Sequence, residues 1–207
     1  MAVMRAIGHQ LAHPHGWRGR IVGAVMDRAN RVPTRLALAR LAAQAGEEVL
    51  DAGCGTGATA AALLGRVPCT VACLDSSPTM LHVAQRRDYG LGRDGLITFH
   101  AGAIGALPFG DAQFDAVLAL NVLYFCDVLG LADLRRVLRP GGRLVAYVTA
   151  RESMSRWPFV RHGTHRLFDA RTLEEMFVHA GFAPERIVIE PVAAGPGVFG
   201  LIACATA

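Results

Sequence analysis

Two acidic residues, Asp51 and Asp75, each stand at the end of a short apolar run, and three glycines follow the first of them. Gly53, Gly55 and Gly57 can adopt backbone conformations that other residues disfavour, and they lack a Cβ that would hold a ligand away. Their backbone N–H groups are therefore predicted to point at a ligand. Asp75 follows the glycines by about 20 residues, at the end of the next predicted strand, where an acid can accept hydrogen bonds from two ribose hydroxyls. The pattern predicts a site for a nucleotide-type cofactor.

Each acid also has a purely structural alternative. Asp75 is close enough to cap a helix beginning near Pro78, although Ser76 or Ser77 can fill that role equally well. Asp51 can orient the glycine loop or reach an amino group of the cofactor, and its structural alternative is to form a salt bridge or stabilise the turn. Both alternatives stay open at the level of sequence.

The glycine spacing argues against a dinucleotide-dependent oxidoreductase. Such sites usually carry Gly-x-Gly-x-x-Gly, with the third glycine deeper in the following helix. Here the third glycine comes one residue early. The chain also has no lysine, so it contains no Tyr-x-x-x-Lys proton relay.

Asn121 and Tyr124 follow the fourth predicted strand, where the carboxyl edge of a parallel sheet opens toward a substrate. An Asn/Asp-Pro-Pro-Tyr motif would hold an amine here, but the chain reads Asn-Val-Leu-Tyr and lacks the prolines. We therefore do not expect a nucleic-acid amine to bind here, and we take Tyr124 as a candidate catalytic residue. The alternative is that Asn121 caps the next segment and Tyr124 packs over it.

The segment 151–168 mixes aromatic, arginine and histidine residues after the fifth predicted strand. Loops at this edge of a sheet commonly carry specificity. Histidine titrates near neutral pH and can deprotonate a hydroxyl, and a glutamate can accept a proton. The candidate bases are His162, His165 and Glu152, while Trp157 and Phe159 are predicted pocket walls; the alternative is a solvated or salt-bridged loop.

The chain before residue 46 reads as helical and precedes the strand-rich part. Ile21 and Met26 lie on one face of a predicted helix, which favours docking onto the rest of the protein. His13, His15 and Trp17 are predicted contacts of a lid over the site. Surface attachment of this helix to a membrane is the less favoured alternative, because its polar face is thin.

Short apolar runs alternate with helix-like segments along most of the chain. This alternation predicts an α/β fold, a doubly wound and mostly parallel sheet with helices on both faces. Two final strands joined by a short glycine- and proline-containing connection should form an antiparallel hairpin. The expected strands are near 47–52, 69–75, 96–101, 113–120 and 142–150, followed by 186–190 and 198–204, and the expected helices are near 57–65, 78–88 and 127–138.

The run Asp51-Ala52-Gly53-Cys54-Gly55-Thr56-Gly57 resembles motif I of the class I S-adenosylmethionine-dependent methyltransferases, Asp/Glu-x-Gly-x-Gly-x-Gly. Three later segments resemble that family in the same order: 102–109, 114–117 and 136–142. The resemblance covers roughly residues 47 to 205. It implies a Rossmann-like sheet of strand order 3-2-1-4-5-7-6, and a single domain with a helical N-terminal cap (1–45) on a core (46–207).

The resemblance also implies which residues bind S-adenosylmethionine. One position departs from the family, because Ala103 replaces the acid that bonds the adenine amino group. We expect backbone groups around Ala103 and Ile104, with packing from Ser76 and Met80, to hold the ring instead. The predicted cofactor-binding residues are Asp51, Ala52, Gly53, Cys54, Gly55, Gly57, Asp75, Ser76, Met80, Ala103, Ile104 and Asn121.

Composition narrows the class of partner. Of 207 residues, 52% are hydrophobic, and the net charge of +4 comes from arginines spread along the chain rather than clustered as in a nucleic-acid-binding element. No run is long enough to span a bilayer and no signal peptide is visible, so a cytoplasmic protein without stable membrane association is expected. The five cysteines lack zinc-ligand spacing, which predicts free thiols and no metal.

Together these features predict methyl transfer from S-adenosylmethionine to a small organic acceptor, releasing S-adenosylhomocysteine. A monomer or homodimer is expected. Three alternatives remain: a methyltransferase of RNA, a methyltransferase of lipid headgroups, and a cofactor-binding subunit without turnover. The acceptor and the methylated atom are not encoded in any motif.

Overall fold

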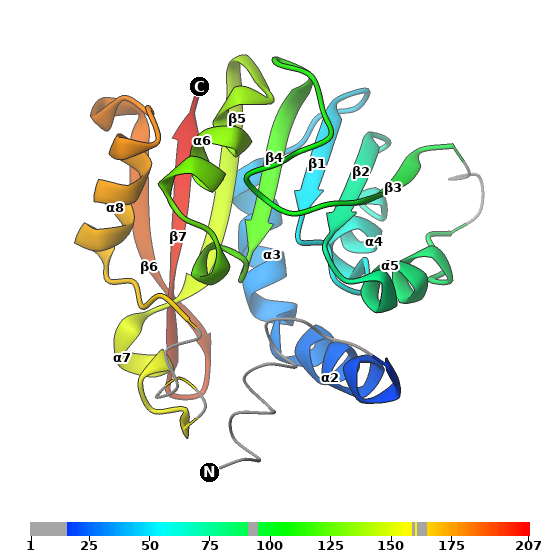
Figure 1. Ribbon diagram of the computed structural model, residues 1–207, viewed down its shortest axis with the longest axis horizontal. Coiled ribbons are helices and arrows are strands. Elements are labelled where there is room, and N and C mark those ends of the chain that lie inside the picture. Colours follow the sequence, from blue (N-terminus) through cyan, green and yellow to red (C-terminus); the bar gives the residue numbers. More distant parts are fainter. Residues whose placement is uncertain (1–15, 91–94, 159, 161–164) are drawn as a thin grey trace.

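The computed structural model describes residues 16–90, 95–158, 160 and 165–207, and within them seven strands form one sheet of order β3-β2-β1-β4-β5-β7-β6 (Figure 1). The first five strands pair in parallel, and β7 runs antiparallel to both β5 and β6. The predicted strand order and terminal hairpin are confirmed. The strands are β1 Glu48–Ala52, β2 Thr70–Asp75, β3 Ile97–Ala101, β4 Phe114–Leu120, β5 Leu138–Thr149, β6 Ile187–Gly195 and β7 Val198–Thr206.

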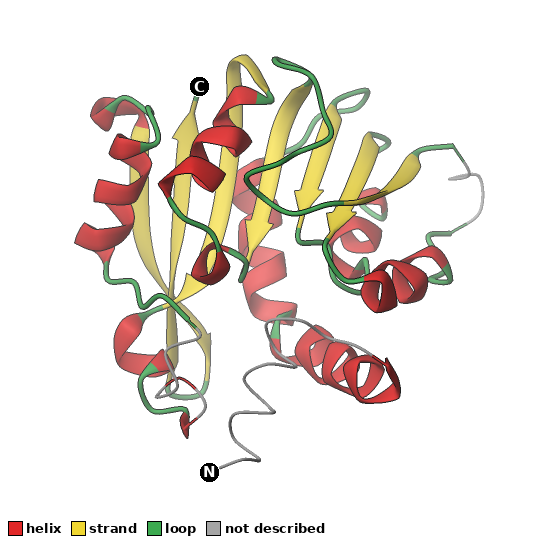
Figure 2. Cartoon of the chain, viewed as in Figure 1, coloured by secondary structure: helices red, strands yellow, loops and turns green. Residues whose placement is uncertain are grey.

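Helices cover both faces of this sheet (Figure 2). One face packs against α6 and α8 through a core that includes Leu134 and Phe177, and the other packs against α3, α4 and α5 through Leu38 and Leu63. Two apolar layers around central strands such as Val49–Leu50 explain why those strands read as continuous apolar runs. The helices are α2 Gly16–Ala29, α3 Arg31–Leu41, α4 Ala58–Leu64, α5 Pro78–Gln85, α6 Val128–Arg136, α7 Arg151–Met154 and α8 Ala170–His179, with 3₁₀ turns at Leu123–Phe125 and Pro184–Arg186.

The predicted helical cap over residues 1–45 divides into two parts with different positions. α3 packs against β4 and β5 and supplies buried residues to the core, so it belongs to the helical layer of the sheet. α2, in contrast, lies past the carboxyl ends of β1, β2 and β4 (Figure 1). Residues 1–15, including His13 and His15, lie outside the described residues, as does the side chain of Trp17.

Two of the family-like segments meet at the edge of the sheet opposite the carboxyl ends. Asp115, at the start of β4, accepts a hydrogen bond from the backbone N–H of Glu48 at 2.8 Å and pairs with Arg139 at 2.6 Å. Arg139 also pairs with the Glu48 carboxylate. A Cβ on Gly142 would lie 2.9 Å from the Arg139 carbonyl oxygen, so only glycine fits there. These residues fasten β1, β4 and β5 together at their beginnings.

The strand β5 starts earlier than the sequence predicts, at Leu138 rather than near 142. Leu138 pairs with Phe114 before a bulge shifts the register, so the Arg-Pro-Gly-Gly segment is carried within the strand. The five cysteines are free, four of them buried and Cys204 half-buried, as predicted. Among the helices in the described part of the chain, none is both long and apolar enough to cross a membrane.

Candidate functional site

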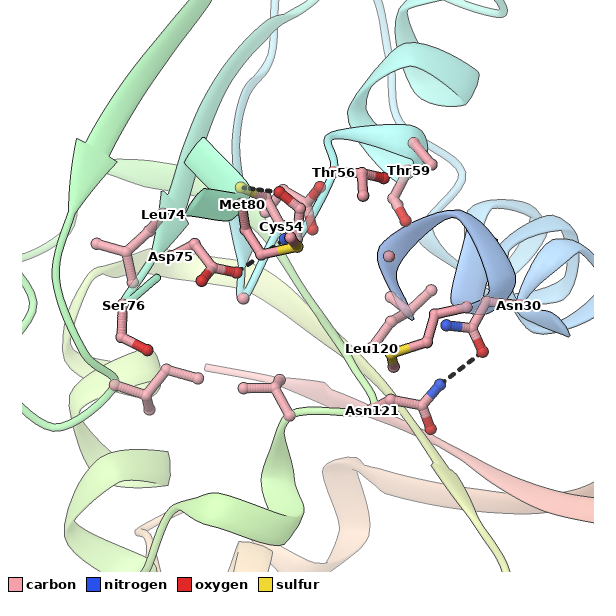
Figure 3. A pocket seen from close by; sticks show the side chains of 18 of the residues that line it. Asn30, Cys54, Thr56, Thr59, Leu74, Asp75, Ser76, Met80, Leu120 and Asn121 are labelled. Carbon is pink, nitrogen blue, oxygen red and sulfur yellow. Dashed lines mark hydrogen bonds between the residues drawn. The ribbon is translucent and has the colours of Figure 1, made fainter. Parts of the chain in front are cut away.

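A cavity of about 250 Å³ lies at the carboxyl ends of β1, β2 and β4, beneath α2. Its walls come from the glycine loop (residues 53–57), the end of β2, the turn 102–104, the exit of β4 and the lid helix α2 (Figure 3). Carboxyl ends of adjacent parallel strands are where ligands bind in open α/β sheets. The position of the cavity therefore follows from the topology.

Most of the predicted cofactor-binding residues line this cavity. Two do not: Ala52 is fully buried within β1, and Gly57 packs against the neighbouring Tyr89. The ten that line it are Asp51, Gly53, Cys54, Gly55, Asp75, Ser76, Met80, Ala103, Ile104 and Asn121.

The glycine loop does not offer its N–H groups to a ligand as predicted. The N–H groups of Gly53 and Cys54 both donate to the carbonyl of Leu74, at 2.8 and 2.9 Å, and that of Gly55 donates to Asp75 Oδ2 at 2.8 Å. The Gly57 N–H donates to the Cys54 carbonyl. The prediction was wrong for the three glycines, because the Gly53 and Gly55 N–H groups fix the loop to the end of β2 and that of Gly57 closes a turn within the loop. The glycines are needed for their positive φ angles instead, 75° at Gly53 and 54° at Gly55.

Asp75 uses both carboxylate oxygens to organise the site. Oδ2 accepts from the Gly55 N–H and Oδ1 accepts from the Ser77 N–H, each at 2.8 Å. Ser77, not Asp75, caps α5 by accepting the Met80 N–H. Burial raises the pKa of Asp75, while the two N–H donors oppose that shift. Each oxygen keeps a further acceptor site, and Asp75 lines the cavity, so a diol can still be bound.

Asp51 is the least satisfied polar group of the site. Its side chain is 2% exposed, and Oδ2 has no hydrogen-bond partner among the described residues. Burial, and secondarily the charge of Asp75, raises the pKa of Asp51 to about 7, opposed by a hydrogen bond from the backbone of Ala60. A buried carboxylate oxygen without a partner costs free energy. The arrangement calls for a cation or donor from a ligand.

Asn121 and Tyr124 form a hydrogen-bonded chain behind the cavity. Tyr124 accepts the Thr149 N–H, so its own hydroxyl proton must go to Asn121 Oδ1, at 2.8 Å. Asn121 Nδ2 then donates to Asn30 Oδ1 at 2.9 Å (Figure 3). Tyr124 is 5% exposed, burial raises its pKa, and it is not among the lining residues. This geometry gives Tyr124 the task of orienting Asn121 and contradicts its predicted role in proton transfer to an acceptor.

The candidates from segment 151–168 lie outside the cavity lining where they are described. Glu152 is exposed on α7, and Trp157 is 36% exposed after it. These positions do not support the predicted base at Glu152 or pocket wall at Trp157, because the short helix α7 places both away from the lining. His162 and Phe159 lie outside the described residues.

His165 is half-buried in the layer behind the lining. Its ring centre lies 4.8 Å from that of Phe125, which lines the cavity, and 5.8 Å from that of Tyr124. Burial lowers the pKa of His165, which keeps the imidazole neutral at pH 7. A neutral imidazole can accept a proton.

A polar network that the sequence did not predict ties α2 to the glycine loop. Thr56 Oγ1 donates to Asp27 Oδ1 at 2.5 Å, and Arg87 Nη2 pairs with Asp27 Oδ2 at 2.5 Å. Arg87 also donates to the Thr56 carbonyl at 2.7 Å. Beside this network a Cβ on Gly23 would lie 2.7 Å from Thr56 Cγ2, so the helix approaches the loop closely. The other lining residues missed from sequence are Met26, Asn30, Thr34, Ala58, Thr59, Leu74, Gly102, Leu120, Val122, Phe125 and Cys126.

We expect Arg87→Met to weaken S-adenosylhomocysteine binding by about tenfold, because Thr56 loses the donor that fixes its carbonyl and α2 loses its ion pair. The free energy of unfolding should fall by only about 1 kcal/mol, since the side chains of Arg87 and Asp27 are each roughly a third exposed. The dissociation constant, measured by titration calorimetry, checks this. Arg86→Met removes the same charge from the exposed neighbouring position and should leave binding unchanged. Equal effects of the two variants would contradict a role for the network.

Comparison with known proteins agrees with this arrangement. Residues 50–146 match the methyltransferase domain family. A demethylmenaquinone methyltransferase of Tropheryma whipplei is 43% identical over 117 residues, which are 54% of this chain and 45% of that protein. An O-methyltransferase of Penicillium expansum is 39% identical over 115 residues, which are 54% of this chain and 41% of that protein. The matched stretch thus spans about half the length of these relatives.

Among solved structures, a chain of the complex between the Haloferax volcanii Trm112 methyltransferase activator and a methyltransferase superposes with a TM-score of 0.79. It is 22% identical in sequence, and the match covers 91% of this chain and 94% of that one. At this identity the likeness shows the fold alone. Over residues 50–146 the chain therefore carries the sequence pattern of the methyltransferase domain family, within a sheet whose strand order is that of a class I methyltransferase.

Proposed function

We propose that the protein transfers the methyl group of S-adenosylmethionine to a small organic acceptor. The observation that carries this proposal is a pair of acids in one cavity: Asp51, which is buried and has an oxygen without a partner among the described residues, and the half-buried Asp75, which is fixed to the glycine loop. The match to the methyltransferase domain family and the names of its relatives support it.

The residues present fit the cofactor. Asp51 Oδ2 lacks a donor, which the cationic amino group of the cofactor would supply. The remaining lone pairs of Asp75 suit the two ribose hydroxyls. Ser76, Met80, Ala103 and Ile104 line the same cavity and would pack against adenine. Ala103 has no side-chain acceptor, so adenine selectivity would rest on packing and backbone groups.

When bound, the cofactor would supply a methyl group on a sulfonium with a good leaving group. The chain's own contribution is then mainly alignment and exclusion of water, which can supply much of the acceleration of a displacement. Met26, Leu120, Val122 and Phe125 provide an apolar wall beside the exit of β4. His165, neutral and packed against Phe125 one layer behind the lining, is our candidate to take up a proton from a hydroxyl acceptor.

A small acceptor is favoured over RNA or a lipid headgroup. No arginine or histidine is found among the described residues that line the cavity, whereas Asp27, Asp51 and Asp75 all are. Phosphate-bearing acceptors usually require cationic partners. The single-domain organisation, the monomeric or homodimeric state, the cytoplasmic location and the lack of a metal stay predictions.

The proposal is tested by thermal unfolding with S-adenosylhomocysteine or NAD. At 100 times its dissociation constant a ligand adds about 2.7 kcal/mol, which should raise the Tm by roughly 5 to 10 °C. We expect the shift with S-adenosylhomocysteine alone. A shift with NAD alone would overturn the cofactor assignment. Binding without transfer of labelled methyl to any acceptor would favour a subunit without turnover.

A further inference from the structure

The end of the cavity formed by α2 and the exit of β4 presents more hydrogen-bond donors than spare acceptors on its two amides. The Asn121 amide is oriented with Oδ1 toward the Tyr124 hydroxyl, which donates to it. Its Nδ2 therefore faces Asn30, whose Oδ1 accepts it at 2.9 Å. Each amide oxygen thus already accepts one hydrogen bond.

The donors left over are the second N–H of Asn121 Nδ2 and both N–H groups of Asn30 Nδ2. Asn30 and Asn121 line the cavity, and so do the hydroxyl-bearing Thr34 and Thr59. Figure 3 shows the two asparagines on the side of the cavity away from Asp75 and Ser76. Donors gathered at one end of a cavity select a ligand group that only accepts hydrogen bonds.

We propose that Asn30 and Asn121 bind the carboxylate at the amino-acid end of the cofactor. This inference rests on the proposed function, which puts ribose at Asp75 and the amino group at Asp51. Asp51, near the end of β1, and Asn121, directly after the paired strand β4, both line the cavity, as binding of one group with an amine and a carboxylate on the same carbon would require. The carboxylate would be held by neutral amides, since no lysine exists in the chain and no arginine is among the described lining residues.

The consequence is that the position of α2 would depend on contact with the amino-acid end of the cofactor. Asn30 follows directly after the last residue of α2, and its backbone N–H donates to the Met26 carbonyl at 2.8 Å. A carboxylate bound to Asn30 would therefore hold the lid helix, alongside the contacts of Asp27 with Thr56 and Arg87. Asn30 thus becomes a cofactor-specificity residue in a segment outside the matched family stretch.

Asn30→Asp tests this with little change of shape. The new carboxylate still accepts from Asn121 Nδ2, but it has lost both N–H donors and repels an anion. Dissociation constants are measured by titration calorimetry for S-adenosylhomocysteine and for 5′-methylthioadenosine, which lacks the amino-acid end. We expect affinity for the first to fall by about 10- to 100-fold, the range for a lost charge-assisted hydrogen bond, and affinity for the second to stay unchanged.

Val25→Asp is the matched control, because it adds the same negative charge to α2 at a side chain that is 63% exposed. It should leave both dissociation constants unchanged. Equal weakening of both ligands by Asn30→Asp would overturn the inference in favour of a general role in lid closure. If Asn30→Asp weakens the binding of neither ligand, the inference is overturned, and the amides of Asn30 and Asn121 are then available to the methyl acceptor. If the wild-type protein binds neither ligand, the proposed function itself fails.

Discussion

Replacing Asp51 by asparagine should make the protein more stable at alkaline pH and at the same time weaken its binding of S-adenosylhomocysteine. The side chain is almost fully buried, with an oxygen that no described residue satisfies. Asparagine keeps one acceptor and carries no charge, so the variant escapes the cost of ionising a buried carboxyl group. It also loses the negative charge that the proposed function assigns to the cofactor's amino group.

The sign of the pH dependence follows from the direction of the shift. The pKa of Asp51 rises from 3.8 to about 7 on folding. Between these values the folded state holds a proton that the unfolded state has released, so this group makes folding less favourable as the pH rises. Above pH 7 the full penalty is present. The difference in unfolding free energy between Asp51→Asn and wild type should therefore grow in favour of the variant by about 3 kcal/mol from pH 5 to pH 8.

Urea unfolding of both proteins at pH 5, 6, 7 and 8 measures this difference. Asp115→Asn serves as a control for an acid whose pKa is lowered, chiefly by the Glu48 N–H and Arg139 against the effect of burial. Its carboxylate stabilises the fold fully above the unfolded pKa, so that variant should be less stable than wild type by a nearly constant amount over the same range. A constant difference between Asp51→Asn and wild type would show that Asp51 is ionised in the folded protein throughout.

Asparagine in place of Gly55 should abolish cofactor binding and leave the fold intact, whereas asparagine in place of Gly57 should damage the fold. Both glycines have positive φ, 54° and 74°, which asparagine tolerates better than most residues. A Cβ on Gly55 meets nothing within 4 Å and enters the space of the cavity. A Cβ on Gly57 would lie 2.2 Å from the hydroxyl oxygen of Tyr89.

The expected magnitudes separate the two variants clearly. Gly55→Asn should change the unfolding free energy by less than about 1 kcal/mol and lower S-adenosylhomocysteine affinity by roughly 100-fold or more through steric exclusion. Gly57→Asn must displace Tyr89 and break its 3.0 Å bond to the Ala84 carbonyl, costing about 1 to 3 kcal/mol. Thermal unfolding and calorimetric titration are run on both. Retained binding in Gly55→Asn would mean that the ligand does not approach this glycine.

The sequence predicted which residues meet on the glycine-loop side of the cavity because the determinants there are local. Glycines after an apolar strand and an acid after the next strand need only the α/β topology to bring them together, and Gly55 and Asp75 do meet. Which atoms meet could not be predicted, since the loop donors bind Leu74 and Asp75 rather than pointing into the cavity. That outcome depends on backbone angles at the glycines, which their identity permits but does not determine.

The contacts of α2 and Asn30 with the rest of the site were not predicted, because they join segments that lie far apart in the sequence. Arg87 and Asp27 are separated by 60 positions, and Asn121 and Asn30 by 91. The helical pattern of the first 45 residues indicates helices but not that α3 would pack on the sheet while α2 covers the site. No local spacing records such pairings, and the burial of Tyr124 behind Asn121 was hidden for the same reason.

The fastening of β1, β4 and β5 by Asp115, Arg139 and Glu48 bears on how such chains are recognised. Asp115 and Arg139 belong to segments that helped to mark the family resemblance, yet they lie at the far edge of the sheet from Asp51 and Asp75. Selection for a correctly assembled sheet can preserve them without any selection for methyl transfer. A descendant that kept this fastening and lost both acids of the cavity would still look like a methyltransferase by those segments, while having no site at which to bind the donor.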